Sequence, residues 1–318
     1  MGLAFVFLLL LFLPVFPGLA QEFPTRPVKI IVPYPPGGVT DLISRAQADP
    51  MAKVLGQPVV IENKPGGGTS LAYSLVASSK PDGYTIGHLA LGTLVGNYLA
   101  YDVAYNPLKS FTYIGEVGIY AMSIIVKADA PWKTWDEFID YSKKHPNEIR
   151  MGFTNPVSTN AIPTKWINKK LGNVWKEVGF DGETPCISAL LGGHIEAFPG
   201  GGAHNILVKD GRARMLLALT SDPIPGYPNV PTFKQIYGKD LNNIVGYIAP
   251  VGIPAPILKK LEKATYEATK APEFLTVMDK MAMTPLWRNS QELSQEAENL
   301  LSILQEFFKD LGKLKKKE

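Results

Sequence analysis

The residues of this sequence that could do chemistry are hydrogen-bond donors placed in glycine-rich turns. Hydroxyl and amide side chains in or beside these turns are Tyr34, Thr40, Thr69, Ser70, Thr93, Asn97, Thr154, Ser158, Thr159 and Asn160. Each of them also suits an ordinary helix cap or turn. Together with backbone N–H groups they are donors suited to carboxylates, without an arginine fork. Catalysis needs a group that moves protons or attacks, whereas binding needs only fixed donors, so the pattern favours a binding protein over an enzyme.

Metal and nucleophile motifs are missing from the sequence. The four histidines are scattered, and neither a His-Glu-x-x-His nor a Cys-x-x-Cys pattern occurs. Neither a nucleophile elbow nor a phosphate-binding loop with its lysine is present. The single cysteine, Cys186, allows no intramolecular disulfide, and we expect a buried, inert thiol. We therefore expect no metal and no cofactor.

The stretch from Val28 to Asp41 places such donors at the start of a helix. A β-branched run ending at Val32 predicts a strand, and three prolines then end it. Gly37 and Gly38 allow a sharp turn, and Thr40 and Asp41 are candidate helix N-caps. A strand, a glycine turn and a helix N-terminus together predict an anion site; the alternative is an ordinary turn with nothing bound.

Similar units follow along the chain. We expect a helix from Thr40 to Leu55, with a kink or break near Asp49 because Pro50 lies inside it. Three successive strand–turn–helix units predict a parallel sheet, and ligands of such sheets sit beyond the carboxyl ends of the strands. Thr134 to Glu137 predicts a capping box, and Ser188 to Leu191 a short helical piece. The last helix should bury one apolar stripe as core packing; the alternative is a partner-binding face.

Composition describes a globular protein of two domains. The chain has 318 residues, of which 46% are hydrophobic and 19% charged. Its net charge is +3, and much of the excess lies in a lysine-rich tail typical of a solvated terminus. Basic and aromatic residues are nowhere interleaved as a nucleic-acid groove would need, so we exclude nucleic acid as a partner.

Residues 1–20 are uncharged and apolar, and they end in small residues. The run is short for a membrane span and contains two prolines, which favours a secretory signal peptide over the alternative of an uncleaved anchor. We expect cleavage after Ala20 and a periplasmic mature protein.

Several ordered motifs resemble one known family, the substrate-binding proteins of tripartite tricarboxylate transporters, also called the Bug or TctC receptors. The matching segments are Phe23 to Gly38, Leu55 to Gly66, Lys80 to Thr85, Ala189 to His194, Val230 to Phe233 and Ala249 to Pro256. They span essentially the whole chain after residue 22.

The resemblance implies a two-domain periplasmic-binding-protein fold (type II, Venus flytrap) in the α/β class, with the ligand between the domains. It places the first domain at residues 22–122 plus 222–318 and the second at 123–221. The crossing strands would lie near Ser123 to Val126 and Met215 to Thr220. The implied ligand is a small carboxylate, a di- or tricarboxylate or related organic acid, and the implied partner is a membrane transporter of the tripartite type. We expect a monomer.

The resemblance also implies which loops bind. The first domain's contacts would come from Pro36, Gly37, Gly38, Thr40 and Asp41 and from the loop around Thr93. Residues 154–160 and, nearby, Gly201 would supply the second domain's contacts. With the neighbouring donors from the turns, the expected ligand-binding residues are Tyr34, Pro36, Gly37, Gly38, Thr40, Asp41, Thr93, Asn97, Thr154, Ser158, Thr159, Asn160 and Gly201.

Three places depart from the family pattern. Pro50 interrupts a helix, Gly182 to Cys186 replaces a tyrosine-lysine-glycine run, and the loop after Phe198 is triple glycine where many relatives have an aspartate. The last two leave the identity of the acid open. Two other functions stay open as well: an organic-acid enzyme on the same fold, with His88, His204 and Asp41 as its candidate groups, and a receptor for a sensor kinase.

Overall fold

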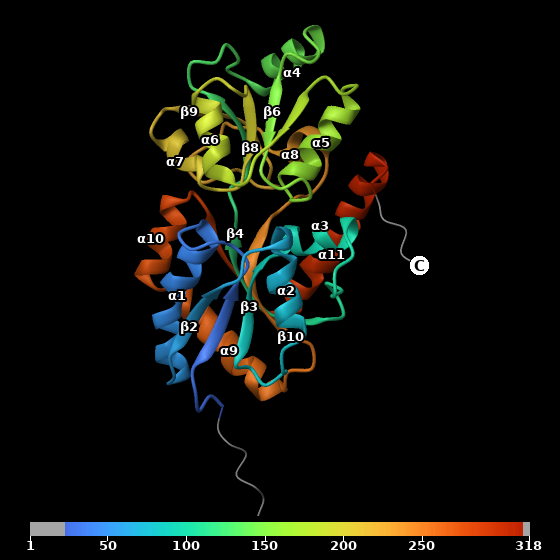
Figure 1. Cartoon of the computed structure of the whole chain (residues 1–318). Coiled ribbons are helices and arrows are strands. Elements are labelled where there is room, and N and C mark those ends of the chain that lie inside the picture. The colour runs from blue at the N-terminus through green and yellow to red at the C-terminus, as the bar shows by residue number, and fades with distance from the viewer. Residues whose placement is uncertain (1–22, 314–318) are drawn as a thin grey trace, which may run out of the picture.

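The computed structural model describes residues 23–313, so the expected signal peptide lies outside the described residues. Two lobes, each built on its own β-sheet, are stacked along the long axis of the molecule (Figure 1). We call the lobe around the six-stranded sheet the first lobe and the lobe around the five-stranded sheet the second lobe. Within this range, no helix combines the length and the apolar character needed to cross a membrane.

The first sheet is mixed rather than parallel throughout. Its strands are β1 (Val28–Val32), β2 (Val59–Asn63), β3 (Thr85–Ala90), β4 (Phe111–Ile119), β10 (Ile244–Pro250) and β11 (Thr284–Arg288), in the spatial order β11-β4-β10-β3-β1-β2. The expected parallel units are present as β2, β1 and β3. The C-terminal strand β10 inserts antiparallel between β3 and β4. This return of the chain joins residues from both ends of the sequence in one sheet.

The second sheet is formed by β5 (Ser123–Lys127), β6 (Arg150–Phe153), β7 (Lys176–Gly179), β8 (Ala197–Gly200) and β9 (Ala213–Ala218), in the order β7-β6-β8-β5-β9. The strands β7, β6 and β8 are parallel, and β5 runs antiparallel to both β8 and β9.

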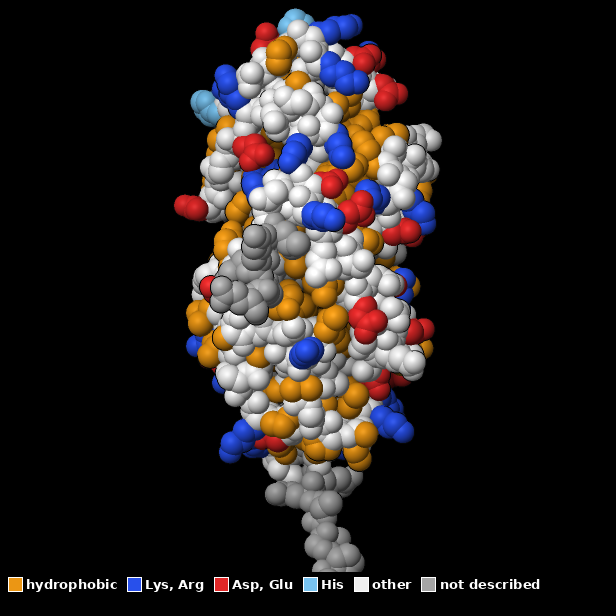
Figure 2. All heavy atoms as spheres, turned by 90° about the vertical axis from the view of Figure 1, so that its right-hand side faces the viewer, with side chains coloured by type: hydrophobic (Ala, Val, Ile, Leu, Met, Phe, Trp, Pro, Cys, Tyr) orange, Lys and Arg blue, Asp and Glu red, His pale blue; other side chains and the backbone are white. Residues whose placement is uncertain are grey.

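Helices cover both sheets. They are α1 (Val39–Leu55), α2 (Ser70–Ala77), α3 (Leu91–Ala100), α4 (Trp135–Lys144), α5 (Ala161–Lys170), α6 (Glu183–Leu191), α7 (His204–Lys209), α8 (Phe233–Tyr237), α9 (Ala255–Ala268), α10 (Pro272–Lys280) and α11 (Ser290–Leu311). The side chains exposed between them carry both charges, and on the face in Figure 2 neither sign gathers into one patch.

The chain passes between the lobes twice, and the two passes lie against each other. The first pass runs from the end of β4 to the start of β5, and the second from β9 to β10. Tyr120 N–H donates to Asn243 O at 2.9 Å, and Leu219 N–H donates to Met122 O at 2.8 Å. The first pass is short, so the edge of the first sheet that holds the carboxyl ends of β1 and β3 faces the corresponding edge of the second sheet.

Two local predictions differ from the structure in part. The helix α1 continues through Pro50 without a break. Pro50 removes one backbone hydrogen bond, but Met51 next to it and Ile43 two turns earlier are fully buried, and this packing of α1 offsets the loss. The predicted capping box of α4 is half formed: Thr134 Oγ1 accepts from Glu137 N–H at 3.2 Å, whereas the Glu137 carboxylate accepts from Lys133 N–H.

The last helix connects the lobes instead of packing inside one of them alone. Phe307 of α11 is fully buried, and its ring centroid lies 5.3 Å from that of Trp166 in α5 and 6.0 Å from that of Phe233 in α8. Trp166 Nε1–H also donates to Asp310 Oδ2 at 2.8 Å. The C-terminal end of α11 therefore lies against the second lobe (Figure 1).

We expect Phe307→Ala to lower the free energy of unfolding by about 3–5 kcal/mol, because it leaves a cavity beside the rings of Trp166 and Phe233. Urea unfolding followed by circular dichroism measures this change. Gln305→Ala, at an exposed position of the same helix, is the matched control and should change stability little. An equal effect of the two substitutions would contradict the packing described here.

Candidate functional site

The N-terminus of α1 presents backbone donors without a capping side chain. Its N-cap is Gly38, not Thr40 or Asp41 as predicted, and no side chain hydrogen-bonds to the cap. The first-turn N–H groups of a helix have no partner within the helix, and they lie at the positive end of its dipole. Gly37 has φ +83°, which allows the turn from the exposed Pro36 into the helix.

Asp41 organises this turn. Its carboxylate accepts hydrogen bonds from Gly37 N–H, Arg45 Nε–H and Asn63 Nδ2–H, each at 2.9 Å. Burial raises the pKa of Asp41, but these hydrogen bonds and the charge of Arg45 outweigh burial and hold the pKa below its ordinary value. Asp41 is therefore an ionised, fully paired carboxylate that positions the loop, and its oxygens face protein donors.

Two hydroxyl pairs stand next to this helix start. Tyr34 Oη lies 3.2 Å from Thr93 Oγ1, and Thr40 Oγ1 lies 3.1 Å from Tyr120 Oη. Tyr120 belongs to the first pass between the lobes, and the sequence analysis missed it. Thr93 is in the first turn of α3, whose N-cap Ala90 also contributes no capping side chain. In α3, Gly92 N–H donates to Asn243 Oδ1 at 3.2 Å. The structure thus places two helix N-termini, of which α1 has no side-chain cap, and four hydroxyls in one region.

Asn97, another predicted site residue, links α3 to a neighbouring turn. Its Nδ2 donates to Gly68 O at 2.7 Å and to Thr69 Oγ1 at 3.2 Å. Its Oδ1 is buried without a hydrogen-bond partner among the described residues. Asn97 therefore ties α3 to the second glycine turn, one helical turn beyond Thr93.

The loop at residues 154–160 belongs to the second lobe and faces α3 of the first lobe. Ser158 Oγ donates to Asn155 O at 2.9 Å and also contacts Asn160 Oδ1, and Asn160 Nδ2 donates to Pro199 O at 2.6 Å. Thr159 Oγ1 lies 3.6 Å from Met122 Sδ, and Thr154 is half-buried. Internal hydrogen bonds hold the loop in one shape against the end of β8.

The two lobes touch at this loop. A Cβ atom at Gly92 would overlap the Thr159 side chain, and one at Gly96 would overlap the Val157 carbonyl oxygen. On the other side of the region, the Cβ position of Gly202 lies 3.5 Å from Val39 Cγ2 and 3.9 Å from Tyr120 Cδ1. The lack of side chains at these glycines permits the close approach of the lobes around the predicted donors.

A second polar group, which the sequence analysis did not identify as a unit, lies beside Gly201. Glu183 Oε1 accepts from Gly201 N–H at 3.2 Å and from His204 N–H at 3.1 Å. His204 Nδ1 lies 3.3 Å from the same oxygen, and Nε2 lies 2.7 Å from Ser123 Oγ. Burial raises the pKa of Glu183, but the His204 side chain and the two N–H groups outweigh burial and leave the pKa below its ordinary value.

The order Ser123–His204–Glu183 is that of a hydrolytic triad, but its chemistry is not available here. Ser123 and His204 are both completely buried, so a substrate carbonyl cannot reach the hydroxyl. His88, another candidate base, is also fully buried; burial lowers its pKa to about 3, and its Nδ1 lies 2.8 Å from Ser44 Oγ below α1. Neither imidazole is placed to exchange a proton with a bound molecule.

No group of three or more His, Cys, Asp or Glu residues among residues 23–313 could hold a metal ion. Cys186, as predicted, is a buried free thiol, and burial raises its pKa to about 12.

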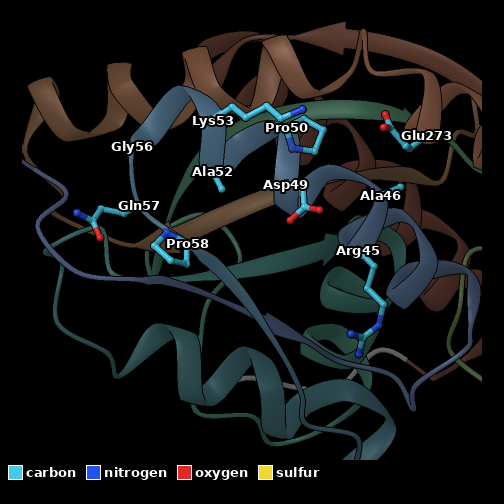
Figure 3. A pocket seen from close by; sticks show the side chains of 10 residues that line it. All are labelled: Arg45, Ala46, Asp49, Pro50, Ala52, Lys53, Gly56, Gln57, Pro58 and Glu273. Atoms are coloured by element: carbon cyan, nitrogen blue, oxygen red, sulfur yellow. The ribbon is translucent and has the colours of Figure 1, made fainter.

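A separate cavity of about 590 Å³ lies beside the C-terminal half of α1 (Figure 3). Its lining includes the exposed Arg45, Asp49 and Lys53 of α1 and Glu273 of α10. Of the predicted ligand-binding residues, none lines it. The candidate site is therefore the region between the lobes.

Comparison with known proteins places these observations in a family. The sequence model described as TctC, tripartite tricarboxylate transporter family receptor, matches residues 43–312. The UPF0065 protein in the gbd 5' region of Cupriavidus necator is 32% identical over 294 residues, which cover 92% of this chain and 90% of that protein.

Solved structures of the same kind superpose well. The periplasmic binding protein BugD has a TM-score of 0.80 at 27% identity, covering 92% of this chain and all of that one. MatC from Rhodopseudomonas palustris, solved with bound malate, has a TM-score of 0.78 at 27% identity, covering 90% of this chain and 99% of that one. The predicted periplasmic-binding-protein fold is confirmed by these similarities.

We expect Gly96→Ala to hold the lobes apart, because the new methyl group would meet the backbone of Val157. Small-angle X-ray scattering should give a larger radius of gyration than for the unchanged protein. Gly179→Ala, where a Cβ meets nothing within 4 Å, is the matched control and should leave the radius unchanged. An unchanged radius in both variants would contradict the importance of this contact.

Proposed function

We propose, from the premise that the chain belongs to the tripartite tricarboxylate transporter receptor family, that it binds a small carboxylate between its lobes and delivers it to a membrane transporter of that type. As a member of a solute-receptor family, it is an extracytoplasmic binding protein. The proposal goes further in assigning a carboxylate, a transporter partner, a periplasmic location and export through a cleaved leader at residues 1–20.

The observation that carries this proposal is the N-terminus of α1, which no side chain caps, beside the N-terminus of α3 at the edge between the lobes. Gly38 precedes α1 without a side-chain cap, and the hydroxyls of Thr40 and Thr93 stand in the first turns of α1 and α3. In α3, Gly92 N–H already donates to Asn243 Oδ1 at 3.2 Å, which leaves the other first-turn donors for a ligand. Backbone N–H groups and hydroxyls at the positive ends of helix dipoles bind one carboxylate without needing an arginine. The nearby Arg45 is paired with Asp41 and is not available for the ligand.

Thr159, Asn160 and Gly201 would contribute from the second lobe. Thr159 meets α3 at Gly92, and the loop at Gly202 meets α1 at Val39. A ligand that contacts both lobes stabilises the closed arrangement over an open one, which is the signal a transporter reads. We propose the domain division 22–122 plus 222–318 and 123–221 as the two bodies that move.

We expect Thr40→Val to weaken binding of the cognate carboxylate by about tenfold, the effect of one lost hydrogen bond to a charged group. Isothermal titration calorimetry against a panel of aliphatic di- and tricarboxylates and aromatic acids identifies the ligand and measures the change.

Thr276→Val is the matched control, because Thr276 carries its hydroxyl on the exposed surface of α10, bonded to Pro272 O at 2.7 Å. It should leave the dissociation constant unchanged. Failure of every acid in the panel to bind the unchanged protein would refute the proposed function, and equal losses in both variants would refute the role of Thr40.

A further inference from the structure

Only one oxygen of the Glu183 carboxylate accepts hydrogen bonds from the protein. Oε1 accepts hydrogen bonds from the N–H groups of Gly201 and His204, whereas Oε2 accepts no hydrogen bond from any residue in the range 23–313. The side chain is 21% exposed, and Oε2 is not among the fully buried oxygens that lack a partner, so it retains access to solvent. This carboxylate oxygen accepts no hydrogen bond from the protein and lies beside the proposed ligand site. It can therefore accept a hydrogen bond from a donor group of the ligand.

Glu183 stands at the part of the region where the two lobes meet. Oε2 is 3.5 Å from the position that a Cβ on Gly201 would take, and Asn160 Nδ2 is 4.0 Å from that position. The next residue, Gly202, abuts Val39 and Tyr120 of the opposite side. The Glu183 charge also contributes to raising the pKa of Tyr120, after the larger effect of burial. Glu183 therefore lies against the loop at Gly201 and Gly202 that approaches Val39 and Tyr120.

The protein fixes the position of this carboxylate. Glu183 is the first residue of α6, and Oε1 is held by the N–H of Gly201, in the loop after β8, and by the N–H of His204, the first residue of α7. His204, which packs against Gly200, places its Nδ1 near the same oxygen and its Nε2 on Ser123. Hydrogen bonds to its charged form keep Glu183 ionised at neutral pH despite its burial. A side chain held in this way is a preorganised acceptor.

We propose that Glu183 selects an acid whose far end carries an N–H or O–H donor, an ammonium group above all, against a dicarboxylate of the same length. This inference rests on the proposed function, in which the helix N-termini of α1 and α3 hold the ligand's carboxylate. A second carboxylate at the far end would meet an oxygen that can only accept, with like charges facing each other. An ammonium group would instead complete the coordination of Oε2.

The test compares pairs of ligands that differ only at the far end. The pairs are γ-aminobutyrate with succinate, δ-aminovalerate with glutarate, and ε-aminocaproate with adipate, titrated calorimetrically into the full mature protein. In the chain length that fits best, we expect the amino acid to bind at least about tenfold more tightly than its dicarboxylate partner. Glu183→Gln should reduce this preference at least about tenfold, with most of the change in the affinity for the amino acid.

Asp181→Asn is the matched control, because it removes one negative charge from an exposed position two residues before Glu183. It should leave the preference unchanged. A dicarboxylate that binds the unchanged protein as tightly as its amino-acid partner would overturn the inference while leaving the carboxylate receptor intact, and this outcome does not depend on how any variant folds. A preference that survives Glu183→Gln in a folded variant would overturn it as well. If neither member of any pair bound, nor any acid of the wider panel, the proposed function itself would fail.

Discussion

Uncapped backbone donors at the start of α1 are the constraint on which the rest of the arrangement depends. A buried N–H group without an acceptor costs free energy, and the first turn of a helix always has several of them. In most helices a side chain at the N-cap supplies one acceptor. Here Gly38 supplies none, and the carboxylate of Asp41 turns back to the loop and to Arg45 instead. In the proposed function, this helix end binds an acceptor from outside the lobe.

The two sheets bring the other groups to this helix end. The pairing of β10 between β3 and β4 fixes the return of the chain, and the two passes between the lobes bond to each other through Tyr120 and Leu219. Tyr120 thereby reaches Thr40, and Ser123 reaches His204 across the second sheet. Glycines at positions 92, 96 and 202 let the lobes approach without side chains between them. On the far side, α11 packs Phe307 against Trp166, so contact between the lobes is not confined to the proposed site.

The features predicted best from the sequence are those set by residues close together along the chain. The strand Val28–Val32 was predicted with its observed bounds, because a β-branched run begins there and three prolines follow it. The break at Pro50 was predicted from the same local rules and is wrong, because burial of Ile43 and Met51 outweighs one lost hydrogen bond. Propensity is a weak prior when tertiary packing opposes it.

Residues brought together over long distances could not be predicted in this way. The helix predicted at Ser188 begins at Glu183, because Pro185 lies in the first turn, where its missing N–H costs nothing. Because the predicted helix began only at Ser188, Glu183 was not assigned to any helix or strand. Ser123 and His204 are 81 residues apart, and no spacing in the sequence joins them. Asn97 was predicted from its type, but the direction of its side chain depends on the turn at Gly68.

The measurement that tests the central claim most directly is native mass spectrometry of the protein after expression into the periplasm, followed by denaturation to identify any small molecule carried with it. The account predicts a single small organic acid, released unchanged from the native protein and lost when Gly38→Trp fills the space in front of α1. An acid retained in full by that variant would contradict the placement of the carboxylate at this helix end. A chemically altered product in place of the acid would contradict the receptor function.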